Sequence, residues 1–133
     1  MVNDHFSHIL SGPIHSPFIW ECTRFCLARR AGRHVAAALT LAGGEIMQNF
    51  SVDHFVGVFD ARMERIYRLI GVTPEVLGTV GEARDRISVG LWHYQREAAP
   101  QVTARAGVSL VQSADWFVRS MGKKSEIPVA LSA

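Results

Sequence analysis

Strand-like and helix-like segments alternate along the chain, and this alternation limits the folds that it can adopt. Short runs rich in β-branched and aromatic residues predict strands at 18–27, 54–59, 72–79 and 87–94. Apolar residues at helical spacing predict helices at 35–50, 61–70, 97–106 and 114–121. Because helices that connect strands in this order pack on a sheet, we expect an α/β layer fold, with residues 1–19 forming an irregular lead-in.

Length and composition indicate one domain with a real core, since 48% of the 133 residues are hydrophobic. The longest nearly apolar stretch, 35–44, is too short to cross a membrane, and the N-terminus lacks the pattern of a signal peptide. Two cysteines cannot build a disulfide framework, which favours a reducing, cytoplasmic setting. The net charge of +2 does not argue for nucleic acid, and the six histidines lack the spacing of metal ligands.

The most informative segment reads Trp20-Glu21-Cys22-Thr23-Arg24-Phe25 and places two charged side chains in an apolar run. Burying a carboxylate or a guanidinium alone is costly, so each needs a partner or a cleft. Side chains alternate along a strand, so Glu21 and Arg24 should face opposite sides unless a bulge intervenes. The residues alone leave a structural reading open, in which Arg24 pairs with an acid elsewhere and Glu21 lies at a sheet edge.

A cluster of arginines follows this segment. Arg29, Arg30 and Arg33 lie close together in a stretch without an acidic residue. Such a cluster is either a solvated loop or a docking patch for an acidic partner or a phosphate group.

The segment Trp20–Phe25 resembles the E-x-[ST]-R-F motif of the LuxI-type acyl-homoserine lactone synthases. Further stretches similar to that family are Asn3–Phe6, Phe55–Gly71, Glu75–Thr79 and Ile87–Trp92. The resemblance implies a three-layer sandwich of the N-acetyltransferase (GNAT) type that lacks its N-terminal strands and helices. We expect this domain over 1–121 and a flexible tail over 122–133.

The function that the resemblance implies is acyl transfer from acyl carrier protein to the amine of S-adenosylmethionine, which acts as a substrate rather than a cofactor. Lactone formation then expels methylthioadenosine and yields a quorum-sensing signal. In this family the residue matching Glu21 is the proposed general base, and the residue matching Arg24 organises the site.

The remaining expected site residues follow from the same comparison. Phe6 and Trp20 are expected to bind substrate, and Thr23 to lie beside the acyl chain. Gly57 stands where members that prefer 3-oxo chains have a threonine, which implies a wider pocket and an unsubstituted acyl chain. The arginine cluster would steer the acidic carrier protein.

The N-terminal half of the family has no counterpart in this sequence, so the resemblance implies a truncated chain that is inactive by itself. Two other functions stay open. The chain is a non-catalytic remnant that binds acyl carrier protein, or another acetyltransferase-fold enzyme that uses acyl-coenzyme A.

Overall fold

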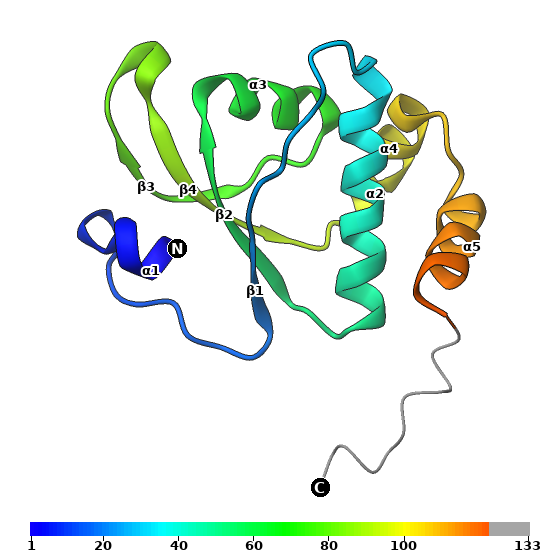
Figure 1. Cartoon of the computed structure of the whole chain (residues 1–133), viewed down its shortest axis with the longest axis horizontal. Coiled ribbons are helices and arrows are strands. Elements are labelled where there is room, and N and C mark those ends of the chain that lie inside the picture. Colours follow the sequence, from blue (N-terminus) through cyan, green and yellow to red (C-terminus); the bar gives the residue numbers. More distant parts are fainter. Residues whose placement is uncertain (123–133) are drawn as a thin grey trace, which may run out of the picture.

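The computed structural model describes residues 1–122, which form one sheet covered on both faces (Figure 1). The sheet has the order β1-β2-β4-β3. Its strands are β1 (Ile19–Cys22), β2 (His54–Asp60), β3 (Glu75–Val80) and β4 (Ile87–His93). β1 and β2 are parallel, whereas the other two pairs are antiparallel. The parallel pair requires a crossover connection, and the helix α2 (Arg33–Asn49) provides it.

The larger helices form one layer. α2 packs there with α3 (Ala61–Ile70), α4 (Ala99–Ala106) and α5 (Leu110–Met121), as Figure 1 shows. Its buried residues come from three of these helices: Ala36, Ala37, Leu41, Ile70, Val102 and Ala106. Burial of these apolar side chains is the main force that holds the helices together.

The other layer is thin. It consists of the short helix α1 (Val2–His5) and the single 3-10 turn Ser7–Ile9, which lie against the opposite face of the sheet. Val2 of α1 packs on Val56 and Val89 there. Together with the sheet and the helix layer, this segment completes the three-layer arrangement that the sequence predicts.

The helix α3 has the bounds that the sequence predicts, 61–70, and both of its ends are capped. The carboxylate of Asp60 accepts a hydrogen bond of 2.8 Å from the backbone N–H of Met63, which caps the N-terminus. Gly71 ends the helix in the left-handed region, at a φ of 93°. The expected break between the two C-terminal helices also occurs at Gly107, with a φ of 67°.

Two expectations were wrong. The strand expected over 18–27 stops at Cys22, because Arg24 adopts a left-handed φ of 56° that no strand can contain. The lead-in over 1–19 is not wholly irregular, because α1 and the turn after it bury apolar side chains against the sheet. The expected flexible tail lies outside the described residues except for Gly122. Within residues 1–122, no helix is both long and apolar enough to cross a membrane.

Candidate active site

The centre of the candidate site is the point where β1 separates from β2. The register of this pair ends at Cys22 opposite Gly57, whereas β2 continues to Asp60. The left-handed conformation of Arg24 turns the chain away from β2 just after this point. A gap therefore opens between the two parallel strands.

A cavity of about 340 Å³ lies on the helix side of this gap. Thr23, Arg24 and Gly57 line it at the gap, and residues of α2, β4 and α4 complete its walls. Most of its lining residues are apolar, and its volume is within the range of small-molecule sites. The cavity is thus suited to an apolar group of modest size.

Aromatic side chains form one wall of the cavity. The rings of Phe59, Tyr67 and Trp92 lie with their centroids 5.2–5.7 Å apart. The indole N–H of Trp92 donates a 2.9 Å hydrogen bond to the carbonyl oxygen of Val72, which fixes this ring. Burial raises the pKa of Tyr67 to about 12, so its hydroxyl is neutral at physiological pH.

Two glycines of α2 form part of the cavity wall that faces the sheet. A β-carbon at Gly43 would lie 3.4 Å from the ring of Phe55, and one at Gly44 would lie 3.2 Å from the ring of Tyr94. Both aromatic residues also line the cavity. The two glycines therefore allow the helix to approach the sheet closely, at some cost in helix propensity.

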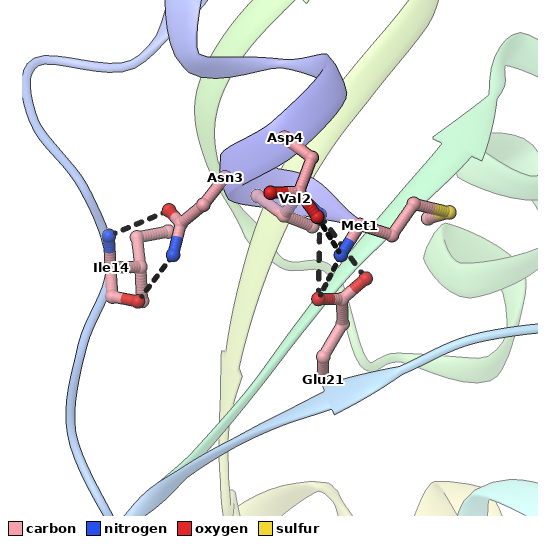
Figure 2. Close-up of polar contacts among 6 residues, drawn as sticks. All are labelled: Met1, Val2, Asn3, Asp4, Ile14 and Glu21. Carbon is pink, nitrogen blue, oxygen red and sulfur yellow. Dashed lines mark hydrogen bonds and ion pairs between the residues drawn. The ribbon is translucent and has the colours of Figure 1, made fainter.

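Glu21 lies on the other face of the sheet. It is aligned with Val56, which belongs to the apolar cluster under α1. Both of its carboxylate oxygens accept hydrogen bonds from the backbone N–H of Val2, at 3.2 and 3.3 Å (Figure 2). The α-ammonium group of Met1 also lies 3.2 Å from Oε2 of Glu21. The hydrogen bond to this carboxylate raises the pKa of the ammonium group.

The residues expected to bind substrate fall into two groups. Thr23, Arg24 and Gly57 line the cavity. Phe6 instead packs in the apolar cluster under α1, and Trp20 is 42% exposed and contacts Phe50. Neither of these aromatic side chains borders the cavity.

Arg24 and the arginine cluster that follows it are both exposed. Within residues 1–122, Arg24 forms no ion pair with an acidic side chain. Arg29, Arg30 and Arg33 lie on the loop before α2 and in its first turn, where no acidic residue balances them. Because a helix N-terminus is itself positive, this end of α2 concentrates positive charge.

Sequence reasoning missed several residues of the site. Cys22 lines the cavity, and burial raises the pKa of its thiol, which therefore stays protonated at neutral pH. Met1, Val2 and Tyr67 were also missed, although Tyr67 lies within the stretch Phe55–Gly71 that is similar to the family. The described residues contain no group of three His, Cys, Asp or Glu side chains that is arranged to hold a metal ion.

Comparison with known proteins shows what the chain is similar to. No family model matches the chain. An acyl-homoserine-lactone synthase from Rhizobium etli is 32% identical to it over 126 residues, which is 90% of this chain. The chain is therefore a homologue of an acyl-homoserine-lactone synthase. It spans 59% of the length of that relative.

Solved structures of such synthases have the same fold as this homologue. The CoA-dependent acyl-homoserine lactone synthase MesI matches it with a TM-score of 0.68 and 22% identity, over 81% of this chain and 57% of MesI. BjaI, another CoA-dependent synthase, matches with a TM-score of 0.67 and 19% identity, over 80% of this chain and 53% of BjaI. These likenesses confirm the N-acetyltransferase-like fold.

Proposed function

We propose that this synthase homologue transfers an acyl group from a thioester to the amine of S-adenosylmethionine and so takes part in making an acyl-homoserine lactone. The observation that supports this most strongly is the cavity at the gap between β1 and β2. Thr23, Arg24 and Gly57 line this cavity, and most of its other lining residues are apolar. Glu21 directly precedes Cys22, a cavity-lining residue at the end of β1, so it lies beside the same gap on the other face of the sheet.

Glu21 would act as the general base of the transfer. Its carboxylate accepts a proton from the substrate ammonium, since only a neutral amine attacks a thioester. The amine nitrogen then forms a bond to the carbonyl carbon, and the carbon–sulfur bond breaks. The leaving thiolate takes up the second proton that the nitrogen releases as the amide forms.

The cavity would hold the acyl chain of the thioester. Its apolar walls favour a hydrocarbon, because burial of each methylene group contributes about 0.8 kcal/mol. Gly57 offers no hydroxyl group to a substituent on this chain, so the pocket suits an unsubstituted acyl group. Thr23 lies where the chain would enter from the gap.

Lactone formation would follow the transfer. The carboxylate oxygen of the acylated S-adenosylmethionine forms a bond to its own γ-carbon, and the bond from this carbon to the sulfonium breaks. Methylthioadenosine leaves as a neutral thioether. BjaI has been solved with MTA and also with SAM and isopentyl-CoA, which agrees with such a sequence of ligands in a relative of this fold.

The acyl donor would carry a phosphopantetheine arm. The uncompensated positive charge of Arg29, Arg30 and Arg33 favours acyl carrier protein, which is acidic. Coenzyme A is the second candidate, because MesI and BjaI are CoA-dependent. Both donors have the thioester and the phosphopantetheine arm. The choice between them therefore depends on whether the arginine cluster binds the protein part of acyl carrier protein.

A chimaera tests the proposed function. Because the chain spans 59% of the Rhizobium etli synthase, it would replace the matching region of that protein. We expect the chimaera to form lactone from S-adenosylmethionine and an acyl thioester, detected by mass spectrometry. The 133-residue chain alone is expected to form none. A chimaera that folds but makes no lactone from either donor would contradict the proposed function.

A further inference from the structure

The side chain of Asn3 joins two segments that are distant in sequence. Its amide nitrogen donates a 2.8 Å hydrogen bond to the carbonyl oxygen of Ile14, and its amide oxygen accepts one of 2.8 Å from the N–H of Ile14 (Figure 2). Asn3 thus satisfies both backbone groups of Ile14, as a neighbouring strand would. Both hydrogen bonds are partly buried, which makes their loss more costly than at a free surface.

This contact closes the segment 3–14 into a loop. Phe6, Ile9 and Leu10 lie inside the loop and pack on the apolar cluster of the sheet. The closed loop fixes the direction of α1, which begins at the residue before Asn3. The helix α1 has only four residues, and so short a helix is not stable without contacts to the rest of the chain.

The direction of α1 in turn decides where the N–H of Val2 points. The side chain of Val2 is only 2% exposed and packs on the sheet, while its N–H bonds to both oxygens of Glu21. Glu21 belongs to an edge strand, and 27% of its side chain is exposed, so its rotamer depends on the N–H of Val2 and the ammonium group of Met1. Both groups lie at the start of α1, so the direction of this helix selects one orientation of the carboxylate.

We propose that Asn3 is a positioning residue for Glu21. It acts through Ile14 and α1, which hold the N–H of Val2 against the carboxylate. The catalytic part of this inference rests on the proposed function, whereas the structural part does not. The competing explanation is that burial of Val2 alone holds α1 in place.

Nuclear magnetic resonance of the 133-residue chain separates these explanations. The carboxyl carbon of Glu21, assigned with Glu21→Gln, reports its orientation, and the amide of Val2 reports its hydrogen bond. We expect Asn3→Ala to shift both signals and to accelerate hydrogen exchange at Val2. Asn49→Ala is the matched control, because the amide of Asn49 bonds only within α2. Unchanged Glu21 and Val2 signals, with a shifted Ile14 amide signal, would overturn the proposal.

Kinetics of the chimaera then test the catalytic part. We expect Asn3→Ala to lower kcat about tenfold or more, since small displacements of a catalytic group are costly, and to leave KM for the acyl thioester unchanged. Asn3→Asp keeps the acceptor for the N–H of Ile14 and should retain more activity than Asn3→Ala. A chimaera without any activity contradicts the proposed function alone, because the resonance experiment still decides whether Asn3 positions Glu21.

Discussion

The β-carbon that Gly57 lacks would lie only 3.0 Å from the carbonyl oxygen of Cys22. These two residues form the last pair in the register of β1 and β2, at the edge of the gap. The absence of a side chain at Gly57 thus lets the parallel strands stay close until the point at which they separate. Gly57 shapes the entrance to the cavity as well as its wall.

We therefore expect Gly57→Ala to change the shape of the gap more than the stability of the fold. The added methyl group displaces the backbone at Cys22, and this strain offsets the gain of about 0.5–1 kcal/mol that alanine normally brings over glycine. In the chimaera, kcat/KM should fall more for long acyl donors than for short ones. Gly12→Ala is the control, since a β-carbon there meets no atom within 4 Å. An equal fall for all chain lengths would contradict this role.

Glu21→Ala in the chimaera should lower turnover by about 10²-fold or more, as expected for the loss of a general base. Glu21→Gln should lose as much, although its amide oxygen still accepts the N–H of Val2. The comparison separates proton transfer from hydrogen bonding. Glu75→Ala, at an exposed glutamate of β3, should keep full turnover. If Glu21→Gln has a turnover close to that of the parent chimaera, the role of Glu21 is structural and not that of a general base.

Charge reversal at Arg30 and Arg33 tests the docking patch. The double variant to glutamate should weaken binding of acyl carrier protein to the chain about tenfold at low ionic strength, mainly through the association rate. Binding of S-adenosylmethionine should not change. Reversal at Arg62 and Arg65, two exposed arginines of α3, provides the control. Carrier affinity that is identical at low and high salt would show that the patch is only a solvated loop.

The buried phenol of Tyr67 predicts a loss of stability in alkali. Its pKa is raised by burial to about 12, against an ordinary value of 10.0. The stabilisation of the neutral phenol is fully present below pH 10 and is lost as the pH rises from about 10 to 12. In urea unfolding across this range, Tyr67→Phe should lose less stability than the parent chain. An equal loss of stability in Tyr67→Phe and in the parent chain would contradict the prediction.

The helices could be predicted from sequence because their signals are local. Asp60 and Gly71 mark the two ends of α3 by their own chemistry, and the apolar spacing of 35–50 places α2 within two residues of its start. The strands after these helices followed from their β-branched residues. Thr23 and Gly57, which the family resemblance singles out, both line the cavity.

The partners of Glu21 could not be predicted, because they depend on contacts between distant segments. Nothing in the sequence around Val2 indicates that its N–H contacts a residue of β1 that lies 19 positions further along the chain. The end of β1 was missed for a related reason. An apolar run continues through Phe25 and Leu27, and only the packing of the whole chain decides that Arg24 turns away from β2.

The gap between β1 and β2 also bears on the order of events in the proposed reaction. The amine would reach it from the α1 side of the sheet, at Glu21, and the acyl chain from the helix side, through the cavity. Neither ligand would then stand in the path of the other. A ternary complex could assemble by either route, and an analogue of one substrate would leave the entry of the other free.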